Sequence, residues 1–185
     1  MSMHATMRLT ADEFLVWAEA QPTGRYQLIA GEIIAMAPEK ADHARSKGSA
    51  WAVLKAAIKR AGLPCEAFVD GLAVRIDEST VYEPDALVNC GERVPGGSTV
   101  ATNPVIVVEV LSPSTAANDH GDKLFDYFSV PSIQHYLIIQ TSKSTVIHHQ
   151  RGIDAKITTT LHTGGDITLD PPGMVVAVSE LVALG

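Results

Sequence analysis

The 185-residue sequence has few aromatic residues, few cysteines and no long apolar run. Aromatic residues make up 5% of the chain, so aliphatic side chains must supply most of a core. The two cysteines, Cys65 and Cys90, have neither CxxC nor metal-type spacing, which excludes the common zinc and dithiol redox motifs. No apolar run approaches the roughly 20 residues that a membrane-spanning helix needs. These absences predict a protein without a membrane span or a cysteine-based metal site.

Basic residues are also in the minority. The chain has 14 Lys and Arg against 21 Asp and Glu, a formal net charge of −7, which does not favour nucleic-acid binding over the whole surface. The first ten residues, MSMHATMRLT, lack the apolar segment of a secretion signal. We therefore expect a cytoplasmic protein, and in a reducing cytoplasm we expect Cys65 and Cys90 to be free thiols.

What the sequence does contain is enough apolar residues for one core. With 46% hydrophobic and 19% charged residues, its length suits a single domain over residues 1–185, of α/β or α+β class. Capping, periodicity and turn signals predict helices at residues 10–20 and 43–61, a further helix ending near 128, and strands within 26–36, 65–76, 81–89, 105–111, 134–140 and 145–149. This order predicts a central mixed sheet flanked by helices, with residues 156–162 and 167–169 as an antiparallel appendage outside the core.

The most informative stretch covers residues 104–127, PVIVVEVLSPSTAANDHGDKLFDY. Its first part, Val105–Leu111, is aliphatic except for Glu109, as is typical of a central strand buried on both faces. An isolated carboxylate in such a strand is costly unless it is paired or bound to a cation. We therefore expect Glu109 to lie at the functional centre.

A second carboxylate is a candidate partner for Glu109. Asp85 follows Pro84 at the start of the preceding apolar strand, so both carboxylates can point to one place if the two strands are neighbours. A cation would offset their repulsion, and carboxylate oxygens with a strand carbonyl suit Mg²⁺ or Mn²⁺. In the alternative interpretation, Asp85 caps a turn and Glu109 pairs with a buried lysine or arginine.

Residues 40–60 carry six basic side chains against one acidic side chain. On a helix such a run is either a solvated face or a local phosphate-binding face that the net charge conceals. The second interpretation makes His43, Arg45, Lys47 and Lys55 candidates for nucleic-acid contacts. His43 could instead support the metal ligands from behind, or be an ordinary histidine at a helix end.

Several segments together resemble a known family. They are YQLIAGEIIAM (26–36), His43, EPDALV (83–88), VVEVLSPST (107–115), Asp119, Lys123 and Tyr127. This series resembles the PD-(D/E)XK signature of restriction-endonuclease-like nucleases, and in particular the Uma-two family of prokaryotic endonucleases, over residues 9–140. The resemblance implies a restriction-endonuclease-like fold and Mg²⁺- or Mn²⁺-dependent hydrolysis of nucleic-acid phosphodiesters, with DNA as the first expectation.

The resemblance also implies roles for individual residues. Asp85 and Glu109 match the metal-binding acids, with the backbone carbonyl of Val110 as a third oxygen ligand. Lys123 matches the active-site lysine, and Glu32 matches an acidic residue contributed from near the N-terminus.

Two of these matches have alternatives. The standard lysine position is occupied by Leu111, so Lys123 has to reach back to Glu109 from the next helix. Otherwise Lys123 is a surface ion-pair partner of Asp119 or Asp126. Glu32, taken on its own, also fits the interpretation that it is a solvated residue beside a hairpin turn.

The leading hypothesis is therefore a metal-dependent endonuclease that works as a homodimer, because enzymes that cut both strands often pair two active sites. One alternative is a non-catalytic protein of the same fold that binds nucleic acid or a protein. A third hypothesis is a metal-dependent hydrolase of small phosphoesters, which would need no basic groove.

Overall fold

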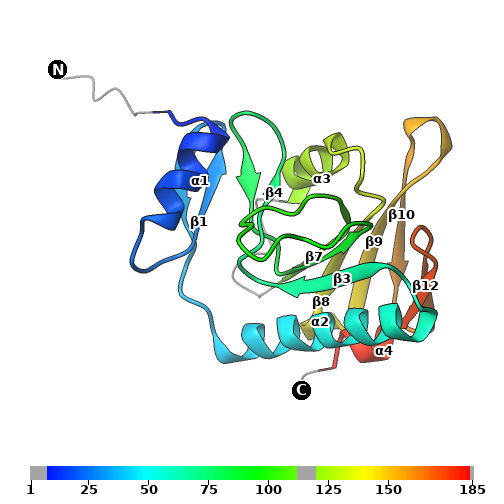
Figure 1. Ribbon diagram of the computed structural model, residues 1–185. Helices are drawn as coiled ribbons and strands as arrows, with labels where there is room; N and C mark the ends of the chain where they lie inside the picture. Colours follow the sequence, from blue (N-terminus) through cyan, green and yellow to red (C-terminus); the bar gives the residue numbers. More distant parts are fainter. Residues whose placement is uncertain (1–7, 112–119, 184–185) are drawn as a thin grey trace.

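The structure is a computed structural model that describes residues 8–111 and 120–183 (Figure 1). The helices are α1 (Ala11–Glu19), α2 (Ala41–Ala61), α3 (His120–Ser129) and α4 (Val178–Leu181). The strands are β1 (Tyr26–Ile29), β2 (Glu32–Ala35), β3 (Cys65–Val69), β4 (Val74–Arg75), β5 (Val81–Tyr82), β6 (Ala86–Cys90), β7 (Pro104–Val110), β8 (His135–Gln140), β9 (Thr145–Arg151), β10 (Ile157–His162), β11 (Asp166–Leu169) and β12 (Met174–Ala177). Short 3-10 segments at Thr141–Lys143 and Ile153–Ala155 flank β9.

The strands form one large and two small sheets. The six-stranded sheet has the order β10-β9-β8-β7-β6-β3, in which β7 and β8 are parallel and the other neighbouring pairs are antiparallel. A four-stranded sheet has the order β2-β1-β5-β4, and β11 and β12 form a hairpin. The parallel pair is joined through α3, as a parallel connection requires a crossover. The predicted class, a mixed sheet flanked by helices, is confirmed.

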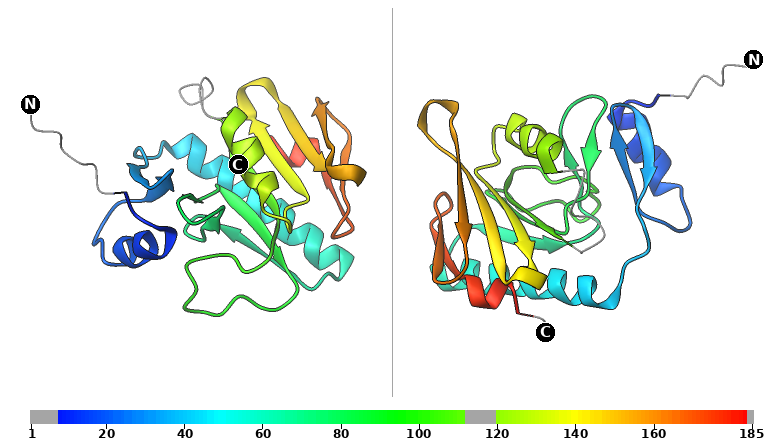
Figure 2. Two further views of the ribbon diagram at one scale, coloured as in Figure 1. Left: turned by 90° about the horizontal axis from the view of Figure 1, so that it is seen from above. Right: turned by 180° about the vertical axis from the view of Figure 1, so that it is seen from behind.

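Helices cover both faces of the six-stranded sheet (Figures 1 and 2). On one face, α2, α4 and the β11–β12 hairpin pack over aliphatic residues of β6, β7 and β8, including Val88, Val108 and Leu137. On the other face, Tyr127 of α3 packs over Leu87, Val107 and neighbouring residues. Because both faces are covered, β7 is buried along almost its whole length, as its aliphatic run predicts.

Local sequence signals explain the ends of two helices. Thr10 caps α1 through a reciprocal capping box with Glu13, as predicted. Gly62 ends α2 in the left-handed region, at a φ of 63°, where a residue with a Cβ atom is disfavoured.

Two expectations about the fold are wrong. The first is that residues 167–169 lie outside the core. Instead, Ile167 and Leu169 of β11 are buried, as are Met174 and Val176 of β12, which packs against α2. Residues 156–162 form β10, an antiparallel edge strand of the six-stranded sheet whose side chains are mostly exposed, as expected for an appendage. The contribution of β11 and β12 to the core is hard to recognise in the sequence, because only every second residue of these short strands faces inward.

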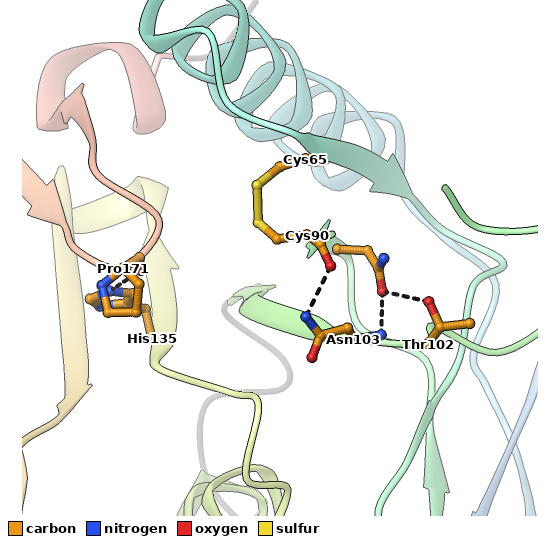
Figure 3. The surroundings of a disulfide bond; sticks show 7 residues. Cys65, Cys90, Thr102, Asn103, His135 and Pro171 are labelled. Carbon is orange, nitrogen blue, oxygen red and sulfur yellow. Dashed lines mark hydrogen bonds between the residues drawn. A yellow bond between two sulfur atoms is a disulfide. The ribbon is translucent and has the colours of Figure 1, made fainter. Parts of the chain in front are cut away.

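The second wrong expectation is that the two cysteines are free thiols. Cys65 begins β3, Cys90 ends β6, and the two residues lie directly opposite each other in the antiparallel ladder, where they form a disulfide (Figure 3). Beside this bond, the Asn103 side-chain amide donates a hydrogen bond of 2.9 Å to the Cys90 carbonyl. Spacing along the chain could not reveal the pairing, because 25 residues separate the cysteines and only strand register brings them together.

Within the described ranges, none of the helices combines the length and the apolar character needed to cross a membrane.

Candidate active site

The candidate site lies where β6 begins and β7 ends. The register pairs Ala86 with Val108 in antiparallel strands, so one further step along each strand sets Asp85 opposite Glu109. The parallel partner β8 pairs with β7 as far as Val110. Asp85 and Glu109, the two predicted carboxylates, therefore lie at neighbouring strand ends, where the Asp85 charge raises the pKa of Glu109.

Asp85 is 5% exposed and is held by main-chain and side-chain donors. Its Oδ2 atom accepts a 2.7 Å hydrogen bond from the Val110 N–H. His43 Nε2 lies 3.4 Å from the same oxygen, and Lys47 Nζ lies 3.9 Å from Oδ1. These contacts tie Asp85 to the end of β7 and to α2.

Glu109 points toward α3. Its Oε1 atom accepts a 2.7 Å hydrogen bond from the Tyr127 hydroxyl and lies 3.1 Å from Lys123 Nζ. Burial raises the pKa of the Glu109 carboxyl, the Lys123 charge acts to lower it, and the Asp85 charge raises it. The two carboxylates therefore interact electrostatically.

Lys123 turns inward. It is 7% exposed, and its ammonium lies 3.1 Å from Glu109 Oε1 and 5.3 Å from the centre of the Tyr82 ring. Of the two surface partners considered for it, Asp126 accepts a hydrogen bond from the Tyr82 hydroxyl, and Asp119 lies outside the described residues. Helix α3 thus places Lys123 beside Glu109, the carboxylate that a lysine at position 111 would contact in the standard motif.

The N-terminal part of α2 supplies a second layer of charges. His43 Nε2 donates a 2.9 Å hydrogen bond to the Val110 carbonyl oxygen, and Nδ1 lies 2.7 Å from Glu39 Oε1. The hydrogen bond to Asp85, together with that to Glu39, raises the pKa of His43 from 6.5 to about 9. The imidazole is therefore cationic at neutral pH in this arrangement.

Lys47 is 1% exposed and is surrounded by carboxylates. Its ammonium lies 2.7 Å from Asp70 Oδ1 and also forms an ion pair with Glu39. A buried ammonium needs such partners to offset its lost hydration. Lys47 thus binds acidic side chains of the site and does not project into solvent.

The other predicted site residues lie farther out. Glu32 is exposed at the start of β2, in the register position opposite Ile29. Arg45 is exposed and pairs with Asp42, and Lys55 is exposed with its ammonium over the Trp51 ring. The predicted nucleic-acid set is therefore divided: His43 and Lys47 face the carboxylates, and Arg45 and Lys55 face solvent.

Several residues of this centre were not among the sequence candidates, namely Glu39, Asp70 and the hydroxyl of Tyr127. One signal was available: Glu39, His43 and Lys47 are spaced four residues apart, which places them along one face of a helix and its lead-in. No such signal marks Asp70, because it lies in a turn after β3 and contacts Lys47 only in the folded chain.

The donors fit a divalent cation. Glu39, His43 and Asp85 each offer a ligand atom, and these atoms lie within 4.8 Å of one another. The Val110 carbonyl, 2.9 Å from His43 Nε2, borders the same place. Carboxylate and carbonyl oxygens suit Mg²⁺ or Mn²⁺, and an imidazole nitrogen suits a transition metal.

A buried aspartate, a partly buried glutamate and a lysine at the end of a central strand of a mixed sheet define a protein with a nuclease-like fold. In keeping with this, the fold is similar to the crystal structure of "a putative nuclease belonging to DUF820" from Anabaena variabilis ATCC 29413. The TM-score is 0.69 at 17% sequence identity, covering 94% of this chain and 97% of that chain. At this identity the likeness concerns the fold alone.

The family is shown by sequence. Residues 11–179 match the model of the Uma2 family, described as "Putative restriction endonuclease", and the chain belongs to this family. It is also 35% identical over 154 residues to the uncharacterized protein sll1609 of Synechocystis sp., covering 82% of this chain and 85% of that protein. A second Synechocystis protein, slr1290, is 31% identical over 145 residues, covering 77% and 75% respectively. The predicted resemblance is confirmed.

Proposed function

We propose that this protein is a metal-dependent endonuclease that hydrolyses phosphodiester bonds in nucleic acid, with DNA as the first substrate to test. The observation that carries the proposal is the pairing of Glu109 with Lys123 beside Asp85, at the end of a strand that is otherwise aliphatic. Burying a carboxylate in such a strand costs free energy, which a bound cation would help to offset. Membership in a restriction-endonuclease family supports the same reaction.

In the proposed mechanism, Asp85, Glu109 and the Val110 carbonyl hold Mg²⁺ or Mn²⁺. When bound, the metal supplies a nucleophilic water and an electrophilic contact to the scissile phosphate. Lys123 places a positive charge next to Glu109, where it can offset the negative charge that develops on the phosphate. Tyr127 fixes the orientation of the Glu109 carboxylate through its hydroxyl.

The outer residues have supporting roles in this proposal. Glu32, exposed on β2, is assigned to steady a second ion or a bound water. Arg45 and Lys55, exposed on α2, are assigned to contact phosphates away from the cleaved bond. One site cuts one strand, so we propose a homodimer for cleavage of duplex DNA.

We also propose a single domain and a cytoplasmic location. The Cys65–Cys90 disulfide weighs against the cytoplasmic location, because disulfides are uncommon in reducing compartments.

A cleavage assay tests the proposal. Purified wild type and Glu109→Ala are incubated with single- and double-stranded DNA and RNA, in Mg²⁺, in Mn²⁺ and in EDTA. We expect wild type to produce internal cuts in DNA that need the metal, and Glu109→Ala to be at least about 100-fold slower. Equal cleavage by the two proteins would identify a contaminating nuclease and contradict the proposal.

A non-catalytic binding protein of the same fold is the second candidate. The inward position of His43 and Lys47 leaves fewer basic side chains of α2 for a nucleic-acid backbone, which favours a protein over a nucleic acid as its partner. No cleavage and no DNA binding by either protein in any metal would support it.

A further inference from the structure

We propose that His43 is a nitrogen ligand of the cation at Asp85, that Glu39 positions its imidazole, and that the centre therefore prefers Mn²⁺ to Mg²⁺. This inference rests on the proposed function, because it concerns the same metal centre. It adds a ligand from α2 to the three oxygen ligands from Asp85, Glu109 and Val110.

The geometry around His43 Nε2 carries the inference. This nitrogen lies 2.9 Å from the Val110 carbonyl oxygen and 3.4 Å from Asp85 Oδ2, two of the oxygens assigned to the cation. Both oxygens can only accept, so the N–H of Nε2 stands between them as a cationic donor. If a cation replaces this proton, which passes to solvent, the Nε2 lone pair points at the same place as the two oxygens.

Glu39 is placed to orient the imidazole ring of His43. Its Oε1 atom lies 2.7 Å from Nδ1, on the opposite side of the ring from Val110. Histidine ligands of metals commonly donate the second ring N–H to a carboxylate, which fixes the tautomer and the ring orientation. Lys47, one helical turn farther along α2, holds Glu39 by an ion pair. We therefore assign Glu39 as a positioning residue and not as a ligand.

The ligand chemistry sets the metal preference. Mg²⁺ and Mn²⁺ both favour oxygen ligands, but Mg²⁺ demands strict octahedral geometry and retains water, whereas Mn²⁺ is a transition metal and accepts an added imidazole nitrogen more readily. An imidazole at this place should thus strengthen Mn²⁺ binding more than Mg²⁺ binding. Without His43, the remaining oxygen ligands should bind the two ions more equally.

Metal binding without nucleic acid tests the inference independently of activity. Calorimetry and electron paramagnetic resonance are used to measure Mn²⁺ binding to wild type, His43→Ala, His43→Gln, Glu39→Gln and Asp85→Asn, with Mg²⁺ as competitor. Asp42→Asn, which changes an exposed carboxylate on the same helix, is the matched control. His43→Gln keeps a side-chain N–H for the Val110 carbonyl, so it separates ligation from folding.

We expect both His43 variants to bind Mn²⁺ at least about tenfold more weakly, to lose the ¹⁴N coupling of the bound Mn²⁺, and to change Mg²⁺ affinity much less. We expect Glu39→Gln to weaken Mn²⁺ binding by about tenfold while keeping a nitrogen coupling, and Asp42→Asn to match wild type.

The contradicting outcomes are distinct. Wild-type Mn²⁺ affinity and nitrogen coupling in His43→Gln would overturn the inference and leave the proposed function intact. Unchanged binding in Glu39→Gln would overturn its positioning role. Wild type that binds neither ion, or Asp85→Asn that binds both as wild type does, would contradict the metal centre itself and with it the proposed function.

Discussion

At the scale of single residues, the partly buried carboxylate of Glu109 is stabilised by specific partners. Lys123 neutralises it and Tyr127 donates a hydrogen bond to the same oxygen. Burial nevertheless raises the pKa of Glu109, so the charged form is held at a cost even with both partners present. This places the carboxylate in a setting where an added cation would be favourable.

Replacing Lys123 should make the free-energy cost of the charged Glu109 carboxylate measurable. In Lys123→Met, Glu109 keeps its negative charge without its counter-ion, and we expect the free energy of unfolding to fall by roughly 3 kcal/mol at pH 8. The folded-state pKa of Glu109 rises further above 4.5, so the loss should shrink as pH falls and the carboxyl becomes protonated. Urea unfolding at pH 8 and pH 5 measures both values.

Lys55→Met, at an exposed position of α2, is the control and should change little at either pH. An equal loss for Lys123→Met at the two pH values would contradict the pairing with Glu109.

His43 should make the stability of the metal-free protein depend on pH. Its folded-state pKa of about 9 lies above its ordinary value of 6.5, so its stabilising contribution is complete below pH 6.5 and is lost as pH rises through about 9. In EDTA, the stability difference between wild type and His43→Gln should therefore shrink between pH 6.5 and pH 9.5. A difference that stays constant over this range would show that His43 is not cationic in the folded protein.

The sequence predicted part of this residue network. Glu109 was recognisable because a single carboxylate interrupts an aliphatic run, and Lys123 was found through the family resemblance. The partners of His43 and Lys47 were not predictable in the same way. Composition assigned both side chains to a basic surface, whereas the packing of α2 turns them toward Glu39 and Asp70.

At the scale of secondary-structure elements, the end of β7 is fixed from three directions. Antiparallel β6 brings Asp85, α2 brings His43, and α3 brings Lys123. The strands of this framework were predictable, because β7 and β8 are continuous apolar runs. The place of β10, β11 and β12 was not, since short alternating strands do not show which neighbour they will join.

The disulfide joins the edge strand β3 to β6, the strand that begins beside Asp85. It closes a loop of about 25 residues, and opening it should lower the free energy of unfolding by about 3 kcal/mol. Chemical unfolding with and without a reductant measures this loss. The variant Cys65→Ala/Cys90→Ala should show the same loss and should no longer respond to the reductant. Titration of two free thiols in the native, unreduced protein would contradict the bond.

At the scale of the whole molecule, a net charge of −7 is accompanied by a small group of inward-facing basic side chains. The basic side chains of His43, Lys47 and Lys123 pair with carboxylates of the site, so their charge is offset locally and adds nothing to a basic surface. Net charge alone therefore could not separate a nuclease from a protein that avoids nucleic acid. Membership in the family described as "Putative restriction endonuclease" is the observation that favours a nuclease.

The most direct measurement of the central claim is the nicking of supercoiled plasmid DNA by wild type and Asp85→Asn, purified in parallel and matched for folded protein. Asp85→Asn keeps the shape of the side chain and an oxygen that can accept from Val110, but it removes the charge that the cation requires. We predict that wild type nicks the plasmid in Mn²⁺ and not in EDTA, and that Asp85→Asn is at least about 100-fold slower. Nicking at equal rates by the two proteins, or nicking by wild type that persists in EDTA, would contradict the account.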